Sequence, residues 1–591
     1  MLFRSCLKSG SIFLFVSDRC NPLHFEPTRS QQIQRLLEPQ PIIDFSFSSL
    51  PLSLPLFLWP TRTRCQWMAS FDTFNCMSPS LSFKLTFMAV NKYIASISRD
   101  SLKVIERLIK AQQMLEALQL LSKIPTKKAP EETTIELASL ARRAGNPKLA
   151  LEKLKFLIQE VNEKKRKPTP SLLLEWGAAL INLRAAQAGI KKLEKVNSTL
   201  HPKALLYLAF GYFSKWDYET SLPLLYHYIE LEMDPYWRSI GKLNLCAAQL
   251  FCNEPEKALA GIHSLFLDPR FSKNKIVRLN LNELFLQSQI RLGDFCSAHR
   301  LLQKVQREGF SKNNLFSLFY EKWAWILKLQ ESGYTNSVKT TQQQLARKAL
   351  TLKHDETLRD LDFWQAKITK KEDLISKLWF GTPHSAFKKR IEREMSFTPP
   401  LHWNYVLKPK ENGQQSEFSL DLASATLAKN AVQYDLGFSQ NSLSHRLLIE
   451  LSNDLYAPKS LLEIYDSLFS GEVYSSINGP TRFHQALFRL RSALKNCGQP
   501  LEVCVKNQNY SLTSKAPLQL IYSTQMPRSK NQSSIEILKT SFQNSPFKRN
   551  EAQKVLKTSE RTTNRILKAA IEMGALKTFG KTSKTQYQIE R

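Results

Sequence analysis

The sequence has few of the residues on which many enzyme folds depend. Only 18 of its 591 residues are glycine, which disfavours large folds that cradle phosphates in glycine-rich loops. The signature motifs of P-loop nucleotide binding, zinc proteolysis, serine hydrolysis and dinucleotide binding do not occur. The ten histidines are dispersed. We therefore assign no catalytic, cofactor-binding or metal-ligating residue, and we expect a protein that is not an enzyme.

Cysteine is also scarce and irregularly spaced. The closest pairs among the nine cysteines, Cys246/Cys252 and Cys497/Cys504, lack the C-x-x-C spacing of zinc sites. An odd number of cysteines without a periodic framework fits a reducing compartment, so we predict a cytoplasmic protein. The longest uncharged run, residues 45–61, is short for a membrane span and contains three prolines. We expect no stable membrane insertion.

Acidic residues are outnumbered by basic ones. The chain has 83 Lys and Arg against 52 Asp and Glu, a formal net charge of +31. Such an excess favours a polyanionic partner, with nucleic acid ahead of an anionic membrane. The hydrophobic fraction of 42% is ordinary for a folded protein, and the length predicts several modules.

Residues 1–87 differ in composition from the rest of the chain. They contain 11 of the 34 phenylalanines and 8 of the 28 prolines, but only five acidic residues. Helical periodicity begins only after Met88. We interpret 1–87 as a disordered extension, or as upstream sequence wrongly included in the protein with Met88 as the working start; a membrane-associated leader is the alternative.

Residues 88–370 predict consecutive amphipathic helices with a recurring pattern. A turn residue is followed five positions later by a small residue and then by an apolar stripe. A small residue is needed where two antiparallel helices cross closely. Successive turn positions lie 32 to 40 residues apart. The pairs are Gln112 with Ala117, Gly145 with Ala150, Trp216 with Ser221, Asn253 with Ala258, Gly293 with Ala298 and, more weakly, Arg184 with Gly189.

This pattern resembles the tetratricopeptide (TPR) family, whose repeat places small residues at the helix crossings. The Trp/Leu-Gly/Tyr signature of that family is mostly missing here. The resemblance implies an irregular α-solenoid whose groove takes an unknown protein partner; a purely structural spacer is the alternative. Aromatic residues such as Trp216 and Tyr218 could line this groove, but core packing is the more common role.

Residues 371–416 are predicted to form a connector, because turn-rich segments replace helical periodicity there. A first module is predicted over residues 417–514. Its expected elements are strands at 417–422, 425–430 and 432–436, helices at 442–452, 458–469 and 480–495, and a hairpin at 500–513.

The helix at 480–495 combines a buried face with a polar face. Its predicted buried stripe consists of Phe483, Leu487, Leu490 and Leu494. The opposite side carries Arg482, Gln485, Arg489 and Ser492. Arginine and glutamine make paired hydrogen bonds to guanine and adenine edges in the major groove, so this helix is a candidate for direct base recognition.

The order of these elements resembles the winged-helix effector domain of OmpR-type response regulators. The resemblance implies that Arg482, Gln485 and Arg489 face the DNA groove. It further places Arg491 and Lys495 near phosphates, with Lys506 on the wing. The sequence departs from the family because Asn509 stands where the hairpin glycine is expected, and because no phosphoacceptor domain precedes the module. Residues 445–525 contain eight basic and six acidic residues, so a protein-interaction or dimerisation module is the alternative.

A linker at 515–532 and a second module at 533–591 are predicted to complete the chain. Helices are expected at 533–543, 547–557 and 558–574, the last capped by Ser559 and ended by Gly574. We expect the inward residues of this last helix to be Leu567, Ala570 and Ile571. The outward residues are Arg561, Asn564, Arg565 and Lys568, and the strand–turn–strand that follows carries Lys581 and Lys584.

The second module resembles the generic winged helix-turn-helix of bacterial regulators, in which the third helix enters the major groove. Residues 526–591 hold 14 basic against five acidic residues, a density that favours phosphate contact. The sequence thus predicts a mainly α protein, a TPR-like solenoid followed by two winged helices that bind double-stranded DNA to regulate transcription. The alternative is a non-enzymatic scaffold whose winged helices contact protein or RNA.

Overall fold

The computed structural model describes residues 102–589, apart from 112, 128, 270–274, 308–314, 408–415, 430–431, 439–441, 470–477, 497–499, 525–529, 544, 557, 573–574 and 581–584. The helix at 102–110 belongs to one compact unit, and the described residues after Gln112 belong to another. The predictions for 1–87 lie outside the described residues. Within the described part of the chain, no helix combines the length and apolar composition needed to cross a bilayer.

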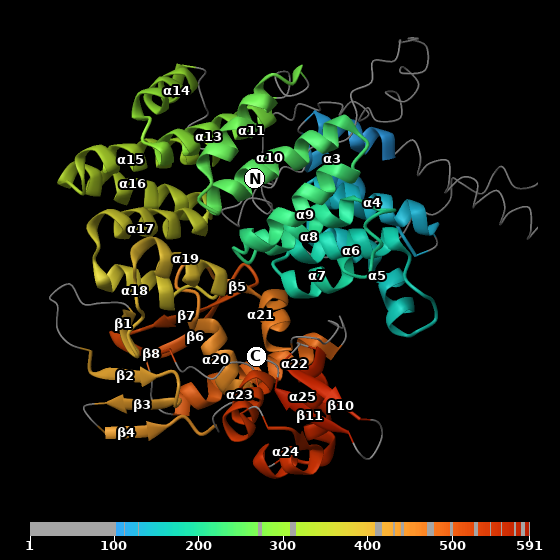
Figure 1. Ribbon diagram of the computed structural model, residues 1–591, viewed down its shortest axis with the longest axis vertical. Helices are drawn as coiled ribbons and strands as arrows, with labels where there is room; N and C mark the ends of the chain where they lie inside the picture. The colour runs from blue at the N-terminus through green and yellow to red at the C-terminus, as the bar shows by residue number, and fades with distance from the viewer. Residues whose placement is uncertain are drawn as a thin grey trace, which may run out of the picture. The chain divides into compact units, whose positions relative to one another are not determined.

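The larger unit begins with consecutive helices joined by short connections (Figure 1). They are α3 (Met114–Lys123), α4 (Glu131–Arg143), α5 (Pro147–Asn162), α6 (Pro170–Asn182), α7 (Ala186–Leu193), α8 (Lys203–Phe213), α9 (Tyr218–Leu231), α10 (Pro235–Phe251), α11 (Pro255–Phe266), α13 (Lys275–Leu292), α14 (Phe295–Arg307), α15 (Leu315–Ser332), α16 (Asn336–Leu352) and α17 (Asp355–Thr369). The expectation of a mainly helical architecture built from consecutive helices is confirmed.

Five of the predicted turn residues end the first helix of a pair in the left-handed conformation, and the sixth, Gln112, lies outside the described residues. Gly145, Arg184, Trp216, Asn253 and Gly293 have φ values of 84°, 66°, 60°, 62° and 77°. At Gly145 the two hydrogen bonds of a Schellman motif are present, from its own amide to Arg142 and from the Asn146 amide to Ala141. The same pair of bonds recurs at the other four turns. At each of these turns one helix ends, and the next helix begins two residues after the turn residue.

The predicted small residues lie at the helix crossings. Ala117, Ala150, Ser221, Ala258 and Ala298 are all fully buried. At Gly189 a Cβ atom would lie 2.8 Å from the carbonyl oxygen of Gly177 and 2.6 Å from Cγ1 of Ile181. Larger side chains at these positions would separate the paired helices.

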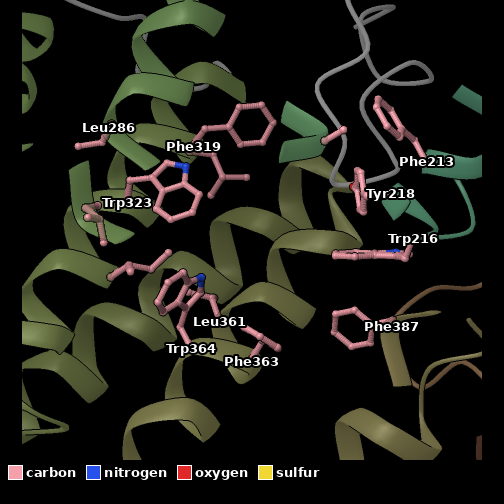
Figure 2. Packing of buried hydrophobic residues seen from close by; sticks show 14 of the residues in the cluster. Phe213, Trp216, Tyr218, Leu286, Phe319, Trp323, Leu361, Phe363, Trp364 and Phe387 are labelled. Carbon is pink, nitrogen blue, oxygen red and sulfur yellow. The ribbon is translucent and has the colours of Figure 1, made fainter. Parts of the chain in front are cut away.

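Aromatic side chains fill much of the solenoid core (Figure 2). Trp216 and Tyr218 are buried, which confirms the core role over a groove-lining role for these two. The Trp216 ring packs edge-on against Phe387, with centroids 4.6 Å apart. Further along the solenoid, Trp323 and Trp364 make a similar contact at 6.1 Å. The packing of Trp216 offsets the strain of a bulky residue at positive φ.

The range predicted as a connector is folded. It contains α18 (Glu372–Phe380), α19 (Ser385–Met395) and strand β1 (His402–Leu407). Leu378, Phe387 and Ile391 of these helices belong to the solenoid core cluster. The solenoid therefore continues to residue 395, beyond its predicted end at 370.

The described residues of the first C-terminal module form two sheets and three helices. The five-stranded sheet has the order β1-β8-β2-β3-β4, and the three-stranded sheet has the order β5-β7-β6. Strand β8 lies in the predicted linker and pairs antiparallel with β1 and parallel with β2, so the sheet extends past both predicted domain boundaries. The elements are β2 (Phe418–Asp421), β3 (Thr426–Lys429), β4 (Val432–Asp435), α20 (Leu443–Ser452), β5 (Lys459–Ser460), α21 (Leu461–Leu468), α22 (Asn478–Asn496), β6 (Leu501–Lys506), β7 (Asn509–Ser514) and β8 (Leu518–Ser523).

In the part of the second C-terminal module that the structure describes, three helices pack with a three-stranded sheet of order β10-β11-β9. Its elements are α23 (Lys530–Phe542), β9 (Phe547–Lys548), α24 (Arg549–Leu556), α25 (Glu560–Glu572), β10 (Leu576–Phe579) and β11 (Gln586–Ile589). Its core forms around Leu538, Phe547 and Leu567. The Phe542 and Phe547 rings stack with centroids 4.2 Å apart.

Candidate nucleic-acid interface

Helix α22 is anchored through one apolar face. The predicted stripe of Phe483, Leu487, Leu490 and Leu494 is buried, with Phe483 fully enclosed. The Phe483 ring meets Tyr510 of β7 edge-on, with centroids 4.9 Å apart. Because this face packs on the module core, the opposite face of α22 is held in a fixed direction toward solvent.

The predicted nucleic-acid contacts on α22 fall into two groups. Gln485, Arg489 and Lys495 are exposed. Arg482 and Arg491 are also exposed, but both contact the module itself. The Arg482 guanidinium lies 4.3 Å from the centre of the Phe469 ring, and Nη2 of Arg491 donates to the Val503 carbonyl at 3.0 Å. These two arginines help to hold α22 in place.

The contacts predicted from the sequence did not include an exposed aromatic residue on α22. Phe488 is 72% exposed and lies one residue before Arg489 and one helical turn after Gln485. Its position off the 483–487–490–494 stripe is the signal that could have revealed it. A phenylalanine presented beside Gln and Arg is suited to contact a thymine methyl group.

A two-residue turn joins the strands of the hairpin β6–β7. Asn507 and Gln508 both have positive φ, 53° and 63°, and Lys506 pairs with Asn509 across the hairpin. This is the geometry of a type I′ turn, which favours Asn at its first central position. Asn509, which stands where the resemblance expects a glycine, is the first residue of β7 and follows this turn directly. Lys506 is exposed beside the turn.

Helix α25 presents its polar residues on one exposed face. Arg561, Asn564, Arg565 and Lys568 occupy positions i, i+3, i+4 and i+7, and all four are exposed. Within the described residues, none of the three basic side chains, Arg561, Arg565 and Lys568, forms an ion pair. The predicted cap is present, because Oγ of Ser559 accepts from the Thr562 amide at 3.4 Å. An ion pair of 2.8 Å between Arg549 and Glu560 joins α24 to α25.

The buried face of α25 differs in part from the expectation. Leu567 and Ala570 are buried as predicted, but Ile571 is 38% exposed and Ile566 is buried instead. Relative to the prediction, the helix is turned about its own axis. Its buried stripe consists of Thr563, Ile566, Leu567 and Ala570. The strands β10 and β11 pair antiparallel as expected. Lys581, Lys584 and Gly574 lie outside the described residues.

No family model and no curated protein matches the chain. A crystal structure of a Rap protein complexed with Competence and Sporulation Factor superposes with a TM-score of 0.36 at 12% sequence identity. The superposition covers 51% of this chain and 97% of the Rap chain.

Proposed function

We propose that this protein is a non-enzymatic, cytoplasmic transcriptional regulator that binds double-stranded DNA through two winged-helix modules. The observation that carries the proposal is the exposed face of α25. Two arginines, an asparagine and a lysine project from a helix that is capped at its start and buried along its other side. Such side chains can donate to base edges and to phosphates at once.

The first C-terminal module supports the proposal by its order of elements. A small sheet precedes α20, β5, α21 and α22, and the hairpin β6–β7 follows. This is the order implied by the resemblance to OmpR-type effector domains. In that arrangement α22 would enter the major groove with Gln485, Phe488 and Arg489, while Lys506 on the hairpin would contact the backbone. The solenoid would receive a protein partner.

Two modules on one chain would also strengthen binding. When the first module is bound, the second is held at a high effective concentration near neighbouring DNA, provided that the geometry allows both to bind. The second module is the more basic of the two. We therefore expect it to supply most of the salt-dependent affinity, and α22 to contribute mainly to sequence preference.

The alternative is a scaffold whose modules contact protein or RNA. The modest charge of the first module and the exposed Phe488 favour this alternative there, because an exposed aromatic also suits a protein interface. Affinities of the full chain for duplex DNA and duplex RNA of the same sequence, measured over a range of salt concentrations, distinguish the two. The proposal predicts preference for DNA and a slope of log K against log salt of several units. Equal affinity for both duplexes, or a flat salt dependence, would favour the scaffold.

A further inference from the structure

The first C-terminal module is attached to the solenoid through a buried, charged junction. Arg359 of α17 is fully buried and donates to Glu356 at 2.6 Å. It also donates to both carboxylate oxygens of Asp454, which precedes α21, at 2.9 and 3.1 Å. Removing one partner from such a buried ion-pair network is strongly destabilising, because a buried charge is left uncompensated. The junction therefore fixes the module to the solenoid.

A second contact of this junction uses backbone groups. The Asp466 carboxylate on α21 accepts from the amides of Gln187 and Ala188 at the start of α7, both at 2.9 Å. The cap residue of α7 itself, Ala185, has no side chain that could do so. Thus the first module supplies the N-cap that this solenoid helix lacks. The Leu455 amide adds a third contact, to the Gly381 carbonyl at 3.0 Å.

The junction brings one solenoid helix to the tip of the hairpin β6–β7. Nζ of Lys148, in the first turn of α5, donates to Oε1 of Gln508 at 3.2 Å. Gln508 is the second residue of the hairpin turn, and Lys506 is two residues before it. Lys148 and Lys506 are both exposed. The solenoid thus places a cation beside the part of the module that would face the DNA backbone.

From this arrangement we infer that the solenoid belongs to the DNA-binding surface: Lys148 extends the phosphate contacts of the hairpin onto α5. The inference rests on the proposed function, because it needs the hairpin to approach a duplex. A lysine binds phosphate as a point charge and releases a counterion, so its contribution is independent of sequence and sensitive to salt. The Gln508 contact holds the ammonium at the tip while leaving it open to solvent.

The test measures the salt dependence of binding for variants of the full chain. The probes are the fragments that the full chain selects from random-sequence DNA, and poly(dI-dC). Lys148→Ala is expected to lower the log–log salt slope by about 0.9 and to weaken binding roughly eightfold at 0.1 M salt, on both probes. Lys148→Arg keeps the positive charge, so it is expected to show the salt slope and the affinity of the wild type. Gln508→Ala, which removes the hydrogen bond but keeps the charge, should leave the slope unchanged.

Two further variants make the outcome unambiguous. Lys339 on α16 is exposed and also carries one positive charge, so Lys339→Ala controls for the loss of net charge alone. Equal effects of Lys148→Ala and Lys339→Ala would overturn the inference. Arg489→Ala tests the proposed function separately. If it weakens binding while Lys148→Ala does not, only the inference fails; if neither variant weakens binding, the proposed function of the first module fails as well.

Discussion

Replacement of Asp466 by alanine should loosen α7, a helix that lies almost 280 residues earlier in the chain. The carboxylate accepts hydrogen bonds from two amides at the start of α7, where the N-cap residue Ala185 makes no side-chain cap hydrogen bond. Loss of an N-cap costs about 1 kcal/mol, and loss of the negative charge at the helix start costs up to about 1 kcal/mol more. Because Asp466 is only half-buried, water can partly replace it. We expect a local loss of about 1.5 kcal/mol.

Hydrogen exchange followed by mass spectrometry measures this directly. An opening free energy reduced by about 1.5 kcal/mol corresponds to roughly tenfold faster exchange in peptides that cover α7 and α21. Asp466→Asn keeps one oxygen acceptor and should give an intermediate rate. Asp217 caps α9 within the solenoid, accepting from the Thr220 amide at 3.2 Å, so Asp217→Ala should accelerate exchange in α9 alone. Unchanged exchange of α7 in Asp466→Ala would refute the role of this contact.

The remaining predictions concern the interface, the repeat and the junction. Phe488→Ala should weaken binding to selected DNA without lowering the melting temperature, because the ring is largely exposed; a matching loss on poly(dI-dC) would contradict a base contact. Gly189→Ala should destabilise the solenoid by about 1–3 kcal/mol in denaturant unfolding, because its Cβ would overlap the Gly177 carbonyl and Ile181; wild-type stability would show that the helices can separate without cost. Burial raises the pKa of Glu356 from 4.5 to about 7, against the opposing effect of Arg359 and Arg184. The folded state therefore binds this proton more tightly than the unfolded state, and the resulting stability is complete below pH 4.5 and lost as the pH rises through about 7. Glu356→Gln should flatten that part of the melting temperature's pH profile, and an unaltered profile would exclude Glu356 as its source.

Local signals in the sequence predicted much of the solenoid. A residue that tolerates positive φ marks the turn between two helices. A small residue five positions later marks the point where the two helices cross. Both features are found at Gly145 and Ala150. The Ser559 cap and the buried stripe of α22 were predictable for the same reason, since each depends on neighbours a few residues away.

Contacts between distant segments were not predictable in this way. Strand β1 pairs with β8, more than one hundred residues later, and neither strand carries a local mark of its partner. The cap that Asp466 gives to α7 also depends on the folded arrangement alone. On α22, Arg482 was predicted on the polar face and Arg491 near phosphates. Both are exposed, but their contacts with Phe469 and Val503 depend on neighbouring elements.

The central claim is that α25 recognises DNA sequence, and selection of genomic fragments by the full chain tests it most directly. The selection is run with the wild type, with Arg561→Ala/Arg565→Ala, and with Lys539→Ala/Lys554→Ala. The last variant removes the same charge from exposed positions on α23 and α24. We predict a recurring sequence motif for the wild type, its loss in the arginine variant, and a weaker but unchanged motif in the lysine variant. The same motif from the arginine variant, or none from the wild type, would contradict the account.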